Sequence, residues 1–206
     1  MRIVPRMFRS ILFAALSLLV AASALAQTSE LGVLFGGSKR LISHSDEAAG
    51  LGISDNFKFG NSVREMYYSL ELDPGTRFKI KAGEIEAPVA FQFATASGKV
   101  RSDLPKGKVE HADALIDYRF SEAFGSTGIF AGVGLYRQRG NVTDDRVPAD
   151  LRGQQEETNY GFSGGVNGDF PITRRSGVIV EATYHWINYH YRPRYVTLSA
   201  GLRFSF

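Results

Sequence analysis

The histidines and the residues beside them are the first candidates for chemistry. His44-Ser45-Asp46 places a base, a hydroxyl and a carboxylate in one short segment, and acyl transfer uses these residue types. Near the end of the chain, His185 and His190 lie in a stretch without a serine at a matching spacing. The absence of cysteine excludes a cysteine nucleophile, a thiolate metal site and a disulfide framework. We therefore expect no enzyme, metal site or cofactor, and keep catalysis by His44 or His190 as an alternative.

A second group of candidates carries charge in segments that are apolar at every second position. Such side chains would line a charged channel, or they would pair inside a narrow, filled interior, where an isolated ion is very costly. We favour an ion-pair core, with a narrow pore as the alternative. Its members are Glu71, Lys79, Lys81, Asp117, Arg119, Asp169, Glu181 and Arg203.

The elements that must position these residues alternate with period two, which predicts β-strands. No segment after the first 26 residues approaches 18 consecutive apolar residues. Eight strands are expected, at Leu31–Ser38, Val63–Leu72, Arg77–Glu86, Val109–Phe120, Gly128–Gln138, Asn159–Phe170, Gly177–Asn188 and Arg194–Phe206.

The connections between these strands alternate in length. Asp73-Pro74-Gly75-Thr76 is a tight turn, and 121–127 and 171–176 are also short. Long connections are expected at 39–62, 87–108 and 139–158, while 189–193 is the one short exception on that end. Short turns at one end and longer loops at the other are typical of outer-membrane β-barrels.

One face of the strands is uncharged through mid-strand, and the other face carries both signs of charge. Strand 77–86 fits this pattern worst, because Glu84 and Glu86 share the phase of the outward Phe78 and Ile80. Either these two carboxylates lie outside, or a bulge at Gly83 reverses the phase. Aromatic residues near the strand ends would form girdles at the membrane interfaces. They are Tyr118, Phe120, Tyr160, Phe170, Tyr184, Trp186, Phe204 and Phe206.

The first 26 residues have the pattern of a secretory signal peptide. Three arginines precede an apolar stretch from Ile11 that ends in Ala24-Leu25-Ala26, a cleavage motif. We expect residues 1–26 to be removed after Sec export and residues 27–206 to form one barrel domain. The formal charge of +3 comes from 24 basic and 21 acidic residues, and the leader carries three arginines, which leaves 21 against 21. A nucleic-acid partner is therefore not expected.

The closing segment, Tyr195-Val196-Thr197-Leu198-Ser199-Ala200-Gly201-Leu202-Arg203-Phe204-Ser205-Phe206, resembles the last strand of bacterial outer-membrane barrels. The chain as a whole resembles the small eight-stranded barrels of the OmpA membrane domain and OmpX type. This resemblance implies an all-β, antiparallel, up-and-down transmembrane barrel in the bacterial outer membrane, acting as a monomer. It also implies that periplasmic chaperones escort the chain and that the assembly machinery reads Phe206.

A structural or surface-interaction role is the function that these patterns favour. Lys99, Arg101, Lys106 and Lys108 lie in one expected loop, opposed only by Asp103, and would contact lipopolysaccharide phosphates. One alternative is a lipid A-modifying enzyme, because some eight-stranded barrels have that activity. The other is a soluble lipocalin-like carrier, in which the apolar face would turn inward around a ligand.

Overall fold

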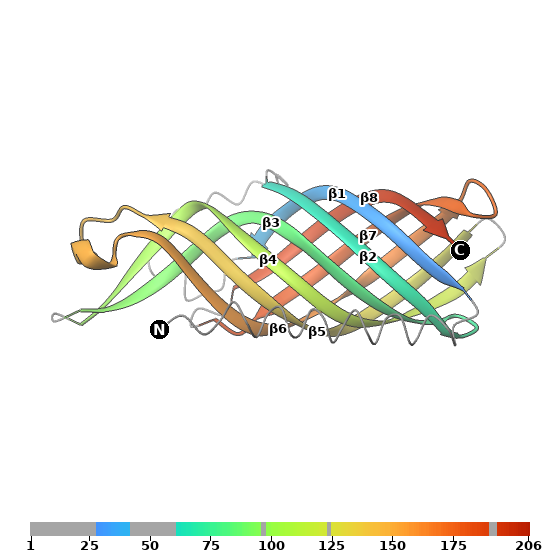
Figure 1. Ribbon diagram of the computed structural model, residues 1–206, viewed down its shortest axis with the longest axis horizontal. Helices are drawn as coiled ribbons and strands as arrows, with labels where there is room; N and C mark the ends of the chain where they lie inside the picture. Colours follow the sequence, from blue (N-terminus) through green and yellow to red (C-terminus); the bar gives the residue numbers. More distant parts are fainter. Residues whose placement is uncertain (1–27, 42–60, 96–97, 123–124, 190–192) are drawn as a thin grey trace.

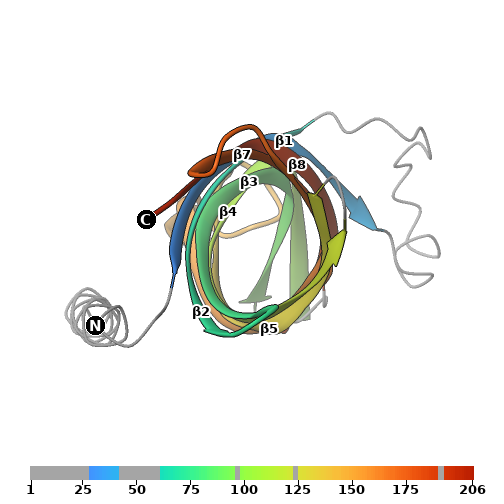
Figure 2. The same ribbon diagram turned by 90° about the vertical axis from the view of Figure 1, so that its right-hand side faces the viewer.

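The computed structural model describes residues 28–41, 61–95, 98–122, 125–189 and 193–206. Its eight strands pair in sequence order, each antiparallel to the next, and β1 pairs with β8 to close the barrel (Figure 2). No helix among the described residues is long and apolar enough to cross a membrane. The strands are β1 (Ser29–Leu41), β2 (Asn61–Asp73), β3 (Thr76–Thr95), β4 (Gly98–Glu122), β5 (Gly125–Val142), β6 (Gly153–Pro171), β7 (Ser176–Ile187) and β8 (Arg194–Ser205).

Short turns connect the strands at one end of the barrel, as the sequence predicts. The β2–β3 turn lies at the same end as the chain's C-terminus (Figure 1). Gly75 has φ 85°, a left-handed conformation that favours glycine, and its carbonyl accepts a hydrogen bond of 2.7 Å from the backbone N–H of Arg119. The expected long connection at 39–62 falls mostly on residues 42–60, outside the described residues.

Burial alternates along most of each strand, and at mid-barrel most of the inward side chains are charged or polar while the outward side chains are apolar. Lys79, Lys81, Asp117 and Glu181 have no solvent exposure, whereas Phe162 on the outer wall is 51% exposed. An outer band of exposed apolar side chains is stable in lipid and unfavourable in water. The soluble lipocalin alternative requires the opposite arrangement, and the structure excludes it.

The phase of β3 resolves the ambiguity at Glu84 and Glu86. The pairing of β3 with β2 and β4 continues without interruption through Gly83, so the bulge considered there is wrong. The register shift lies higher, between Ala87 and Val89. Ile85 therefore points inward and is fully buried, while the Glu84 carboxylate accepts a 2.8 Å hydrogen bond from Lys108 on the outer wall.

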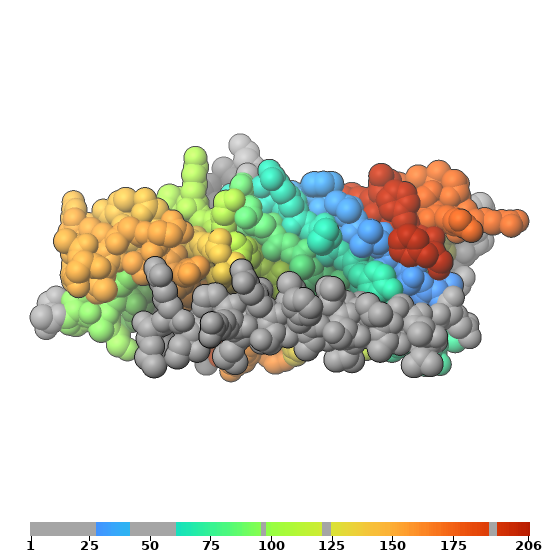
Figure 3. Space-filling view, in the orientation of Figure 1, coloured from blue at the N-terminus to red at the C-terminus, as the bar shows by residue number. Residues whose placement is uncertain are grey.

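Much of two expected long loops, 87–108 and 139–158, is strand instead. β3 and β4 continue as a paired hairpin to Thr95 and Gly98, and β5 and β6 continue to Val142 and Gly153. The segment between β5 and β6 contains the short 3-10 helix η1 (Ala149–Leu151). These two hairpins form an extension at the end opposite the C-terminus, as Figures 1 and 3 show. The sequence predicts loops there because outward apolar residues no longer recur at every second position beyond the apolar band. The strands nevertheless continue past this point.

One apolar core fills both the extension and the upper part of the lumen. Val89, Phe91 and Leu104 from the β3–β4 hairpin belong to one buried cluster with Val142 and Val147 from the β5–β6 side. β4 pairs with β5 only up to Lys108 and Arg139, so the two hairpins separate above this point while their inner faces remain packed. The extension is therefore a packed structure, and it continues directly from the barrel wall.

Candidate functional sites in the lumen and on the outer wall

The lower part of the lumen, near the turns, contains a compact ion-pair cluster. Arg119 of β4 contacts Asp169 at 3.0 Å, Asp117 at 3.1 Å and Glu30 at 3.2 Å. Arg203 of β8 also holds Asp169, at 2.7 Å. With Arg77, which pairs with Glu30, this lower cluster contains three cations (Arg77, Arg119, Arg203) and three carboxylates (Glu30, Asp117, Asp169).

The upper cluster lies in the middle of the barrel and joins opposite walls. Glu181 of β7 pairs with Lys79 and, at 3.3 Å, with Lys81 of β3. Lys81 also lies 3.5 Å from Glu65 of β2 and donates to the Thr183 hydroxyl at 3.1 Å. These four charged side chains have no solvent exposure.

A histidine completes this upper cluster. His111 Nδ1 lies 2.6 Å from Asp113, and its Nε2 lies 3.3 Å from Glu65. Carboxylates lie beside both ring nitrogens, which favours the imidazolium form of the ring. The upper cluster then has three cations, from two lysines and His111, against three carboxylates, from Glu65, Asp113 and Glu181. Each cluster is thus neutral by itself.

The second buried histidine, His185, contacts two hydroxyl groups, an arrangement that suits a neutral ring. The Tyr136 hydroxyl donates to Asp113 Oδ1 at 2.7 Å, so it accepts from His185 Nδ1 at 3.1 Å. His185 Nε2 then accepts from the Thr197 hydroxyl at 3.3 Å. Ligating atoms of His111, Asp113 and His185 lie within 4.8 Å of one another, a spacing that a metal ion could use. The network already engages these atoms and balances the charge, and a divalent ion would upset that balance.

Seven of the eight residues expected in the ion-pair core are buried in these two clusters. Glu71 is not among them, because it lies at the turn end of β2, partly exposed, and accepts a hydrogen bond from Thr28. Sequence reasoning missed Glu65, which has the same strand parity as Glu71, since the alternation was not followed along β2. It also left His111, Asp113 and His185 out of the ion-pair core, although all three lie on the charged face of their strands.

The expected girdle residues all lie on the outer wall in two bands. Near the turns, Tyr118 and Phe120 form an edge-to-face pair with ring centroids 5.0 Å apart, and Phe170 and Phe204 are about half exposed. At the other end, Phe162 packs against Trp186 at 5.5 Å. Tyr160, Tyr184 and the C-terminal Phe206 are also exposed.

The four basic residues expected to bind lipopolysaccharide do not form one cluster. Lys99 is near the tip of the β3–β4 hairpin, and Arg101 pairs with Asp103 at 2.7 Å. Lys106 and Lys108 lie lower on the same strand, roughly 23 Å and 30 Å from Lys99 at about 3.3 Å per residue. They line a hollow of about 610 Å³ where β4 and β5 separate. We call this hollow the notch.

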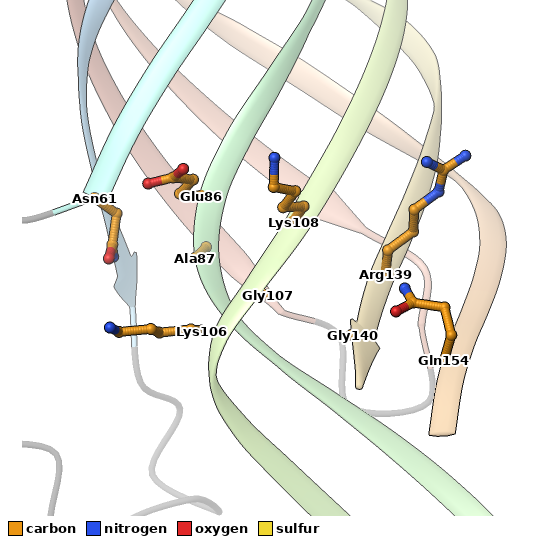
Figure 4. Close-up of a pocket in the computed structure, with 9 residues that line it drawn as sticks. All are labelled: Asn61, Glu86, Ala87, Lys106, Gly107, Lys108, Arg139, Gly140 and Gln154. Carbon is orange, nitrogen blue, oxygen red and sulfur yellow. The ribbon is translucent and has the colours of Figure 1, made fainter. Parts of the chain in front are cut away.

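The notch is lined by side chains and backbone from five strands, β2 to β6. Figure 4 shows Lys106 extending toward Asn61, with Glu86 and Lys108 on adjacent strands and Arg139 beside Gln154. Its lining residues are Asn61, Glu86, Ala87, Lys106, Gly107, Lys108, Arg139, Gly140 and Gln154.

The catalytic alternatives cannot be placed in the same way. His44 and His190 lie outside the described residues, and the described histidines, His111 and His185, are enclosed in the lumen. A base must approach a substrate to act on it, and these two rings are shielded from both water and lipid.

No protein-family model matches the sequence, and no curated protein is detectably similar to it. Solved structures do match the fold. The N-terminal β-barrel domain of Pseudomonas aeruginosa OprF is 11% identical with a TM-score of 0.53, covering 88% of this chain and 98% of that one. Neisserial surface protein A (NspA) is 14% identical with a TM-score of 0.52, covering 87% and 96%. A major outer membrane protein from Thermus thermophilus is 11% identical with a TM-score of 0.51, covering 87% and 99%. The chain therefore has the fold of the small outer-membrane β-barrels.

Proposed function

We propose that this protein is a closed outer-membrane anchor that displays the two-hairpin extension at the cell surface for contact with envelope or external molecules. The observation that carries this proposal is the combination of a filled lumen with an extension whose apolar core continues from the top of that lumen. Tyr67, Tyr136 and Tyr195 fill the interior together with the two neutral ion-pair clusters. An eight-stranded barrel is only wide enough for its own side chains, so a non-conducting role fits this interior.

The remaining parts of the proposal concern export and assembly. A leader at 1–26 would take the chain through the Sec pathway, and periplasmic chaperones and the assembly machinery would deliver a monomer to the outer membrane. Catalysis is not part of the proposed role, because the described histidines belong to the lumen network.

Single cysteines test the display, since the chain has none of its own. Lys99→Cys, near the tip of the β3–β4 hairpin, should react with a membrane-impermeant maleimide on intact cells. Arg174→Cys, in the β6–β7 turn at the opposite end, is the matched control and should react only after the envelope is permeabilised. The reverse labelling pattern, or no surface labelling of Lys99→Cys, would refute the proposal. Planar-bilayer recording complements this test, because discrete conductance steps would contradict a closed lumen.

A further inference from the structure

The notch carries an excess of positive charge among the groups that line it. Lys106, Lys108 and Arg139 are cationic, Glu86 is the one carboxylate in the lining, and further carboxylates just outside the lining pair with two of the three cations. Lys108 is paired with Glu84 at 2.8 Å. Arg139 is held by Glu110 at 2.8 Å and by Glu156 at 3.3 Å. No carboxylate of the described residues lies within 4 Å of the Lys106 ammonium group.

These pairs orient two of the three cations on the rim of the notch. The guanidinium of Arg139 has limited freedom because two carboxylates hold it from different strands. Lys106 is exposed and supplies an ammonium group that is not neutralised by a described neighbour. Asn61 and Gln154 add amide groups that can bind hydroxyl or phosphate oxygens. The set suits a ligand that carries both phosphate and sugar hydroxyl groups.

A second hollow lies directly below the notch on the same wall. Ala82, Ala112 and Leu135 form its apolar part, and Glu110 and Arg137 lie on its rim, around a volume of about 280 Å³. Ala82 pairs with Ala112, and Ala112 pairs with Leu135, so two small side chains stand side by side on the outer wall. Their small size leaves a depression in the apolar band, which we call the alanine groove.

The position of both hollows relative to the membrane follows from the strand register. Arg64, Glu84, Glu110 and Arg137 are successive pairing partners across β2 to β5, and they form the first charged row above the apolar band. The alanine groove is one row below this boundary. Lys108 and Arg139 are two residues above it along their strands, about 7 Å at 3.3 Å per residue. The notch therefore lies at the height of lipid headgroups, and the groove at the height of acyl chains.

We propose that the notch and the alanine groove together bind one phosphorylated glycolipid of the surrounding outer leaflet. Lys106, Lys108 and Arg139 hold the headgroup phosphate, and an acyl chain lies against Ala82 and Ala112. This inference rests on the proposed function, since it requires the extension to face the outside of the cell. It identifies the ligand class as a membrane lipid, because a soluble anion would have no use for the apolar groove below the cations.

The test uses the full barrel refolded in detergent, with purified diphosphoryl lipid A as the probe and native mass spectrometry as the readout. The wild-type protein should retain one lipid A molecule and should retain dephosphorylated lipid A at least tenfold less. Lys106→Gln with Lys108→Gln should weaken retention roughly tenfold or more, because two charge-assisted contacts are lost. Ala112→Leu should weaken it by filling the groove while leaving both cations in place.

Matched variants control for charge and for folding. Arg174→Gln with Arg175→Gln removes the same charge at the opposite end, and Ala131→Leu adds the same side chain to the outer wall outside the groove. Both should retain lipid A as the wild type does, and heat-modifiable gel mobility should show that every variant folds.

Several outcomes would overturn the inference. They are equal retention of dephosphorylated lipid A, no effect of the lysine pair, equal losses in the controls, and displacement of lipid A by an equal concentration of pyrophosphate. The last result would mean that the notch binds free anions without the groove. If these outcomes occur while Lys99→Cys is labelled on intact cells, only the lipid site fails and the displayed anchor stands.

Discussion

The contacts of the upper ion-pair cluster allow us to predict how much Glu181→Gln lowers the free energy of unfolding. Glu181 is fully buried and is the carboxylate that pairs with both Lys79 and Lys81. Without it, Lys81 keeps Glu65 at 3.5 Å, whereas Lys79 keeps only the faces of Tyr67 at 4.2 Å and Phe130 at 5.0 Å. Removing one partner of a buried ion pair costs about 3–5 kcal/mol, because the remaining charge stays in a poorly solvated site. We expect Glu181→Gln to lower the free energy of unfolding by about this amount.

A second substitution distinguishes this explanation from a general loss of packing. Adding Lys79→Met to Glu181→Gln removes the orphaned ammonium group, so the double variant should recover stability relative to Glu181→Gln alone. The single variant Lys79→Met should cost less than Glu181→Gln, since Glu181 still has Lys81 as a partner. The two positions should therefore be coupled in a double-mutant cycle.

Urea unfolding in lipid vesicles measures these differences, and the single tryptophan provides the signal. Trp186 packs on the outer wall against Phe162, so its emission should move to longer wavelength when the barrel leaves the bilayer. Lys99→Met near the hairpin tip is the charge-matched control and should leave the midpoint unchanged. A cost below about 1 kcal/mol for Glu181→Gln, or a double variant that is less stable than the single one, would refute the reasoning.

Three further predictions concern other parts of the barrel. His111→Gln removes the third cation of the upper cluster and should cost about 2–4 kcal/mol in urea unfolding, and adding Glu65→Gln should recover part of it by restoring balance. Gly201→Val should abolish heat-modifiable mobility, because a Cβ there would lie 1.8 Å from the backbone oxygen of Val33, where β8 meets β1. The control variant Ala200→Val, on the lipid-facing side of β8, should be tolerated. Side-chain and backbone hydrogen bonds from Arg146 lower the pKa of Asp144 from 3.8 to about 2, so this contact is fully present above pH 4 and is lost as the pH falls through about 2. Asp144→Asn should speed protease cleavage between β5 and β6 at pH 7, and an unchanged cleavage rate would show that the contact does not order this segment.

The strand positions and the inverted arrangement of charge could be predicted because both follow from local alternation. Phe204 and Arg203, for example, are neighbours in sequence and must face opposite sides of a strand. Glu84 and Glu86 were ambiguous for the same local reason. Whether a carboxylate on the outer face is tolerated depends on its height in the membrane, and alternation does not encode height.

The composition of each charge cluster could not be predicted, because it depends on which walls meet across the lumen. Lys79 and Glu181 are 102 positions apart, and only the closed barrel brings them together. The notch could not be predicted from the sequence for a similar reason. Lys106 and Lys108 are visible as basic residues, but the separation of β4 from β5, which makes the hollow, arises from the pairing limits of two hairpins.

The ion pairs across the lumen also constrain how the barrel can form in a membrane. They connect β1 with β4, β3 with β7, and β6 with β8. A chain that lacks β7 and β8 has neither Glu181 nor Arg203, so each cluster carries a net charge and Lys79 has no carboxylate beside it in a low-dielectric environment. A fragment ending before β7 should therefore fail to insert, and strands should enter the bilayer together rather than one after another. Charge balance inside the lumen is therefore a property of the complete barrel, because Glu181 and Arg203 come from the last two strands.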